Sequence, residues 1–155
     1  MTKRVLPAIY VDQHLKPDLM KPFEEEGFKC LPIAKTKKYA GRDEKDYIKE
    51  IYAEGKLFAT GDIAFIEYVR EQSIKHAGIV WIPPPSAEET PLEIVSVLAQ
   101  IIKWFIKDHG KNALRRLIVY IGKDGYRLID PHGEDILLYS WGAYAIDFEI
   151  PNYFW

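Results

Sequence analysis

The sequence predicts an α/β domain built on a central parallel sheet, with antiparallel hairpin strands added at its C-terminal end. Short apolar runs alternate with helical stretches over residues 5–109, which is the pattern of parallel strands joined by helices. Three more apolar runs then follow, separated by the short turns 123–125 and 130–133, and this spacing is typical of hairpins. The length of 155 residues fits a single domain.

Four predicted strands and the helices that follow them account for residues 5–109. Each strand is an apolar run that stops at a polar residue or a turn, and each helix carries apolar residues on one face. Pro22 should kink or delay the first helix, and Thr90, Pro91 and Glu93 form a capping box for the fourth. In chain order the elements are strand 5–11, helix 17–26, strand 28–33, helix 43–54, strand 56–59, helix 63–72, strand 78–82 and helix 90–109.

The remaining part of the chain predicts hairpin strands over 117–121, 126–129 and 135–139, followed by an aromatic tail over 142–155. The tail ends in Tyr153, Phe154 and Trp155, three rings that would form an adhesive patch in water. We therefore expect the tail to pack on its own sheet or against a second copy of the chain. The second arrangement predicts a two-fold homodimer.

Composition and charge exclude several classes of protein. The 21 basic and 23 acidic residues give a formal net charge of −2, which argues against binding of polyanions by the whole surface. Cys30 is the single cysteine, so the chain forms no internal disulfide and we expect a reducing compartment. No apolar run has the length of a membrane span and no export signal is recognisable, which favours a cytoplasmic location. The scarcity of Asn and Gln resembles the composition of thermophile proteins.

Polar side chains follow neighbouring strands of the predicted sheet, where the carboxyl ends of parallel strands share one edge and ligands usually bind. Carboxylates that converge there repel each other unless a cation such as Mg²⁺ or Mn²⁺ lies among them. Alternatively, the same acids serve only as helix caps. The residues concerned are Asp12 after the first strand, Thr60 and Asp62 after the third, and Asp43, Glu44 and Asp46 at the start of the second helix.

The loop after the second strand is basic, and it carries Lys35, Lys37, Lys38, Tyr39 and Arg42. These side chains could hold a nucleic-acid backbone, with the ring of Tyr39 stacked on a base. They could equally form an ordinary solvated loop.

Four stretches of the chain resemble one known family. They are Tyr10-Val11-Asp12-Gln13-His14-Leu15-Lys16-Pro17, then Phe23-Glu24-Glu25-Glu26-Gly27-Phe28, then Glu54-Gly55-Lys56-Leu57-Phe58-Ala59-Thr60-Gly61-Asp62 with Phe65, and last Ala77-Gly78-Ile79-Val80-Trp81-Ile82-Pro83 before a long helix. Their order and spacing are similar to those of the small PIN-like proteins of the Mut-seven C-terminal type. The resemblance covers about residues 4–121. It implies that these residues and the hairpins and tail over 122–155 form a single PIN-like domain of 155 residues.

The resemblance implies a three-layer fold with an acidic pocket that binds Mg²⁺ or Mn²⁺ and cleaves RNA. Asp12 and Asp62 match two of the family's acids, and Thr60 matches the hydroxyl that orients the loop. The acid at the helix start is ambiguous between Asp43, Glu44 and Asp46. This chain departs from the family where His14 replaces an asparagine and Ala64 replaces a second acid. His14 could restore a metal ligand, which would favour Mn²⁺, and Glu67 is a more remote substitute.

The sequence thus favours a metal-dependent endoribonuclease that acts on single-stranded RNA as a toxin or an RNA-processing enzyme. As a toxin it would have an antitoxin or another protein partner. The two departures from the family pattern support an alternative. In this alternative the chain is a PIN-like module that has lost catalysis and binds nucleic acid or protein.

Overall fold

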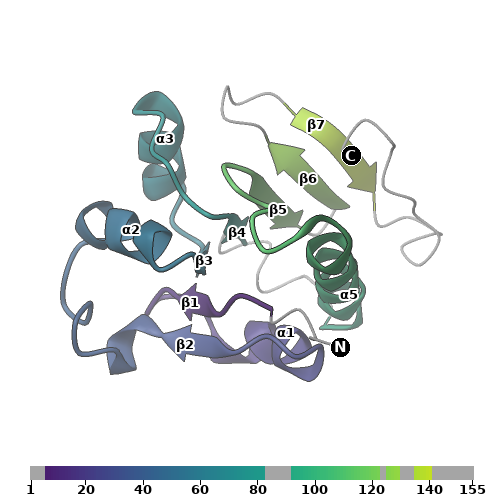
Figure 1. Cartoon of the computed structure of the whole chain (residues 1–155), viewed down its shortest axis with the longest axis horizontal. Coiled ribbons are helices and arrows are strands. Elements are labelled where there is room, and N and C mark those ends of the chain that lie inside the picture. Colours follow the sequence, from purple (N-terminus) through teal and green to yellow (C-terminus); the bar gives the residue numbers. More distant parts are fainter. Residues whose placement is uncertain (1–5, 83–91, 123–124, 130–134, 141–155) are drawn as a thin grey trace.

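The computed structural model describes residues 6–82, 92–122, 125–129 and 135–140. Within these ranges the chain forms a seven-stranded sheet in the order β2-β1-β3-β4-β5-β6-β7 (Figure 1). The first five strands of that order are parallel, and β6 and β7 pair antiparallel with their neighbours. The strands are β1 (Ile9–Val11), β2 (Cys30–Pro32), β3 (Leu57–Thr60), β4 (Ile79–Trp81), β5 (Ile118–Gly122), β6 (Gly125–Ile129) and β7 (Asp135–Ser140).

Helices cover both faces of the sheet, so the described part of the chain has three layers (Figure 1). Neighbouring residues of a strand point to opposite faces, and the two cores follow this alternation: Ile9 and Val11 belong to one core, and Tyr10 belongs to the other. The helices α1 (Lys21–Glu25) and α5 (Leu92–His109) cover the first core. The helices α2 (Glu44–Ala53) and α3 (Ile63–Glu71) cover the second.

The predicted helices agree with the structure in position, with small differences at their ends. Pro22 delays the first helix as expected, because Pro17–Met20 form a 3-10 turn and α1 begins only at Lys21. A second 3-10 turn, Ile33–Lys35, lies in the loop after β2. The capping box at Thr90, the aromatic tail and the dimer inferred from it fall on residues outside the described ranges and stay predictions.

The order of the strands determines where a ligand can enter the sheet. The chain passes from β1 to β2 on one side and then crosses back to β3 on the other side of β1. The connections therefore diverge at the carboxyl ends of β1 and β3, and a crevice at such a point is the usual ligand site of a parallel sheet. None of the described helices is both long enough and apolar enough to cross a membrane.

A network around Glu54 ties the end of α2 to the loop after β2. Its carboxylate accepts hydrogen bonds from the hydroxyls of Tyr10, at 3.0 Å, and Tyr39, and from the ammonium groups of Lys38 at 2.9 Å and Lys56 at 3.1 Å. Burial by itself would raise the pKa of this carboxyl, but the four donors outweigh it and lower the pKa to about 2.

Replacing Glu54 by glutamine should therefore destabilise the protein near neutral pH, by about 1 kcal/mol for a partly solvated group. The pKa of Glu54 is lower in the folded chain than its ordinary 4.5, so its stabilising effect is complete above pH 4.5 and is lost as the pH falls toward 2. Urea unfolding of the wild type and Glu54→Gln at pH 7 and pH 3 should show a difference that shrinks in acid. The account would be contradicted if Glu54→Gln lowered the free energy of unfolding equally at both pH values. It would also be contradicted if Glu71→Gln, a substitution at an exposed glutamate, lowered it as much as Glu54→Gln does.

Candidate functional site

Asp12 and Thr60 form the buried base of a site at the carboxyl edge of the sheet. Asp12 follows β1 directly and its backbone N–H donates to the carbonyl of Ala59 in β3, at 2.9 Å. Its side chain is 4% exposed, and its Oδ2 accepts a hydrogen bond of 2.9 Å from the hydroxyl of Thr60, which is fully buried. The same hydroxyl accepts the backbone N–H of Asp62 at 3.1 Å. Thr60 therefore fixes both the Asp12 carboxylate and the loop that carries Asp62.

Asp62 caps the helix that leaves this edge. Its Oδ1 accepts the backbone N–H groups of Ala64, at 2.9 Å, and Phe65, at 3.3 Å, at the start of α3. A hydrogen bond with Glu44 lowers the pKa of Asp62, burial opposes this, and the two amides and the charge of Lys45 lower it further. Asp62 is thus ionised at neutral pH. The cap role considered from the sequence is real for this residue, and it coexists with a contact to a second acid.

Glu44 is that second acid, and it is the first residue of α2. Partial burial, the hydrogen bond with Asp62 and the negative charges of Asp62 and Asp12 together raise the pKa of Glu44 to about 7. Near neutral pH Glu44 therefore keeps its proton more readily than an ordinary glutamate, and it can donate that proton to a hydrogen bond with Asp62. We refer to Asp12, Glu44 and Asp62 as the acidic cluster.

The structure distinguishes among the three acids that the sequence left open at the helix start. Asp43 is the N-cap of α2, and its Oδ1 accepts the backbone N–H of Lys45 at 2.9 Å. Asp46 is exposed, and its charge acts on Arg42. Glu44 is the acid of this turn that the structure brings to Asp62 and Asp12.

Tyr47 is a neighbour of the acidic cluster that the sequence analysis did not identify. Its side chain is 1% exposed, and burial followed by the charges of Asp12, Glu44 and Asp43 raises the pKa of its hydroxyl. The ring belongs to a row of aromatic contacts in the core beneath the cluster, between Tyr39 at 5.3 Å and Phe58 at 5.8 Å. Its position three residues after Glu44 places both on one face of α2, and this spacing could have indicated it.

The two departures from the family pattern lie close to this site. His14 is exposed, and its Nε2 lies 3.4 Å from the Nε2 of Gln13. Ala64 is exposed on the first turn of α3, where its backbone amide binds Asp62. Glu67, the more remote substitute, is exposed one turn further along the same helix.

The basic loop does not offer all its side chains to a ligand. Lys38 pairs with Glu54 at 2.9 Å and Arg42 pairs with Glu50 at 2.5 Å. Tyr39 is 1% exposed and its hydroxyl binds Glu54, so the structure does not place its ring where it could stack on a base. The expectation for Tyr39 is corrected here, because the ring packs between Tyr10 and Tyr47 in the core.

Lys35 and Lys37 are both exposed. Lys35 lines a cavity of about 230 Å³ that reaches Asp12 from the side of β2. Most of its lining is apolar, from Leu15, Met20 and neighbouring residues, and Asp12, Glu24 and Lys35 supply its charges. Cys30 also lines it. Burial and then the charge of Glu24 raise the pKa of its thiol to about 12, so Cys30 is not a reactive thiolate.

Within the described residues, no three His, Cys, Asp or Glu side chains are arranged so that they could hold a metal ion. Thr60 orients the Asp12 carboxylate, and Oδ1 of Asp62 is engaged by the amides at the start of α3. Comparison with protein families, with curated proteins and with solved structures finds no match to this chain.

Proposed function

We propose that this chain is a PIN-like, metal-dependent ribonuclease that hydrolyses phosphodiester bonds in single-stranded RNA. The observation that carries the proposal is the convergence of Asp12, Glu44 and Asp62 where the strand connections diverge. Acids that only cap separate helices would lie too far apart to shift each other's pKa values. Acids whose pKa values are shifted because they lie together in a crevice at a sheet edge are typical of functional sites.

The acidic cluster supplies the carboxylate oxygens that a hard divalent cation such as Mg²⁺ or Mn²⁺ prefers. Binding would have to draw the three carboxylates closer together than they lie in the described structure. The Thr60 hydroxyl leaves Oδ1 of Asp12 without a described donor, and Asp62 accepts the helix amides through Oδ1, which leaves its Oδ2. The hydrogen bond between Glu44 and Asp62 raises the pKa of Glu44 and lowers that of Asp62, so a neutral, protonated Glu44 relieves the repulsion between the two acids. A cation held by these residues would take the place of that proton, so we expect binding to release it.

Each residue of the acidic cluster would then have its own role in hydrolysis. When bound, the cation supplies an activated water and neutralises charge on the phosphate. Thr60 holds Asp12 in one orientation, and Asp62 stays fixed by the first turn of α3. Glu44, once the cation has displaced its proton, would be ionised and could orient an attacking water by accepting a hydrogen bond from it.

The surroundings of the acidic cluster favour a single strand over a duplex. The cavity next to Asp12 has apolar walls and exposed Lys35 at its rim, which suits an unstacked nucleotide and its phosphate. Lys37 lies exposed in the same loop and can neutralise a further phosphate. A toxin role and an RNA-processing role would both use this arrangement.

A second candidate is a PIN-like module without catalysis that binds nucleic acid or protein. Ala64 favours it, because a carboxylate at that position would add an oxygen ligand on the first turn of α3. The engagement of Asp62 by the helix amides favours it as well.

Calorimetric titration with Mn²⁺ and cleavage of single-stranded RNA separate the two candidates. For the ribonuclease we expect Mn²⁺ to bind with release of a proton, seen as a heat that depends on the buffer, and RNA to be cleaved only with the metal. The inert module would bind RNA without cleaving it. Glu44→Gln should bind Mn²⁺ about 10- to 100-fold more weakly and without that proton release. Wild-type protein that neither binds Mn²⁺ nor cleaves RNA would contradict the proposal.

A further inference from the structure

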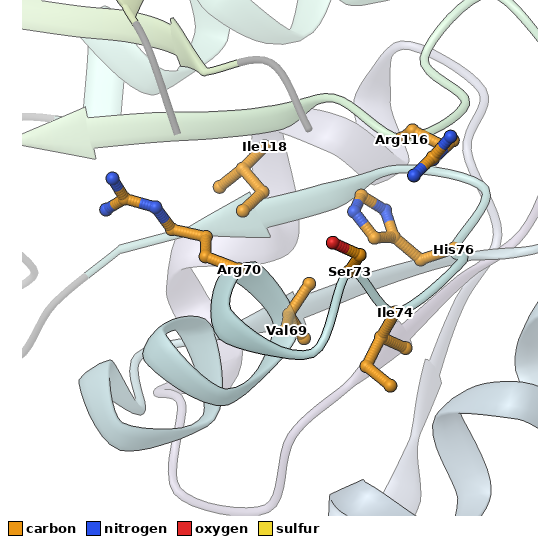
Figure 2. Close-up of a pocket in the computed structure, with 7 residues that line it drawn as sticks. All are labelled: Val69, Arg70, Ser73, Ile74, His76, Arg116 and Ile118. Atoms are coloured by element: carbon orange, nitrogen blue, oxygen red, sulfur yellow. The ribbon is translucent and has the colours of Figure 1, made fainter. Parts of the chain in front are cut away.

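A second pocket lies at the opposite, amino-terminal edge of the sheet. It is formed by the end of α3, the loop that leads into β4 and the turn that leads into β5 (Figure 2). Arg70, Ser73, His76 and Arg116 supply its polar lining, together with three apolar side chains. The acidic cluster stands at the carboxyl ends of the strands, so the two sites are separated by the length of the strands.

Two nitrogen atoms in this pocket are buried without a partner. Among the described residues, neither Nδ1 of His76 nor Nε of Arg116 has a hydrogen-bond partner. The side chain of His76 is 3% exposed, and Figure 2 shows its ring between Ser73 and the guanidinium of Arg116. Buried polar atoms in folded proteins nearly always have a partner, which can be a protein group, a water or a ligand. The two nitrogens therefore indicate a missing acceptor.

The backbone holds these groups in place. The N–H of Arg116 donates to the carbonyl of His76 at 2.9 Å, which joins the approach to β4 with the approach to β5. Arg116 has a φ of 65° and Ser73 has a φ of 49°, both in the left-handed region. Because the two residues bracket the pocket, its shape is fixed by the chain before any ligand enters.

The charges in the pocket select the ligand. Arg116 places a cationic guanidinium beside His76, whereas the guanidinium of Arg70 points away from both (Figure 2), and none of the side chains that line this pocket, all within the described part of the chain, is acidic. Burial and then the nearby charge of Arg116 lower the pKa of His76 to about 4, so the imidazole is neutral and can donate one N–H. The enclosed space of about 10 Å³ admits one water-sized group, such as a single oxygen atom.

We propose that this pocket binds a phosphate group, with one oxygen inserted between His76 and Arg116 and the others facing the solvent at the mouth of the pocket. An N–H of the imidazole and the Nε–H of Arg116 would donate to the inserted oxygen. The remaining guanidinium N–H groups would meet the outer oxygens, an arrangement that arginine side chains favour. The site is independent of the acidic cluster and does not require that the chain cleaves RNA.

The test is a titration of the full chain with inorganic phosphate at constant ionic strength, followed by two-dimensional NMR of the backbone amides. We expect saturable shifts confined to residues 70–78 and 114–118. Arg116→Gln should weaken binding at least about tenfold, since it removes a charged hydrogen-bond partner. Arg70→Gln, an exposed substitution at a guanidinium that points away from the buried groups, should leave binding close to that of the wild type.

Arg115→Gln is the matched control, because the neighbouring Arg115 side chain donates to the hydroxyl of Tyr52 and does not line the pocket. It should bind phosphate as tightly as the wild type. A parallel titration with adenosine monophosphate identifies the kind of phosphate that the pocket accepts. If adenosine monophosphate binds as well as inorganic phosphate, the pocket accepts phosphate esters; if only inorganic phosphate binds, the pocket is specific for the free ion. Absence of saturable shifts, equal binding of acetate, or equal weakening by Arg115→Gln would each overturn the proposal.

Discussion

Replacing Asp12 by asparagine should lower the rate of RNA cleavage at least about 100-fold while leaving the fold intact. Removal of groups that only orient metal ligands already costs about 10- to 100-fold, and Asp12 would contact the cation itself. The asparagine side chain has nearly the same shape, and its carbonyl oxygen can still accept the hydroxyl of Thr60. The loss should therefore come from the missing charge and not from unfolding.

Cleavage of a short fluorescent single-stranded RNA in Mn²⁺, compared at equal protein concentration, measures this effect. Asp18→Asn is the matched control, because Asp18 is an exposed acid of the following 3-10 turn that pairs with Lys21 at 3.4 Å. It should keep wild-type activity. Thermal unfolding of both variants should stay close to that of the wild type. Full activity of Asp12→Asn would remove the acidic cluster from the mechanism.

The sequence predicted the layout of the sheet edge because a simple geometric rule applies there. Parallel strands end on the same edge, so Asp12 and Asp62 had to lie near each other once their strands were recognised. The rule is weaker for helix starts. One residue of shift turns a helical side chain by about 100°, so Asp43, Glu44 and Asp46 could not be separated before the start of α2 was known.

The composition of the loop after β2 does not determine whether its basic side chains are free to bind a ligand. Its lysines and arginine suggested a nucleic-acid surface, but Glu50 and Glu54 lie eight and sixteen residues away from their partners Arg42 and Lys38. Such pairs depend on how α2 returns across the sheet. Tyr39 was predicted at the surface for the same reason, since a loop position gives no sign that its ring enters the core.

The pocket around His76 could not be predicted from the sequence either. His76 and Arg116 are forty residues apart, and each stands alone beside an ordinary turn. They come together because β4 and β5 are neighbours in register, with Ile79 beside Ile118. Only the strand pairing places the loops before the two strands side by side.

Gly78, next to that pocket, should be the glycine least tolerant of change. Its φ of 140° is one that residues with a side chain rarely adopt. A Cβ atom there would lie 2.9 Å from the Cβ of Leu114 and 2.9 Å from Cδ2 of Leu57. The end of Leu57 can move, but the Cβ and the carbonyl of Leu114 are fixed by the turn before β5.

Gly78→Ala should therefore lower the free energy of unfolding by about 2 to 5 kcal/mol, which combines the strain of the backbone with overpacking. Gly55→Ala is the control: its φ of 70° is also left-handed, but among the described residues nothing lies within 4 Å of the added Cβ. It should lose only about 1 to 2 kcal/mol. Urea unfolding of the two variants measures the difference. Equal losses would contradict this account, because Gly78 differs from Gly55 both in its close contacts and in a φ of 140° that lies outside the left-handed helical region.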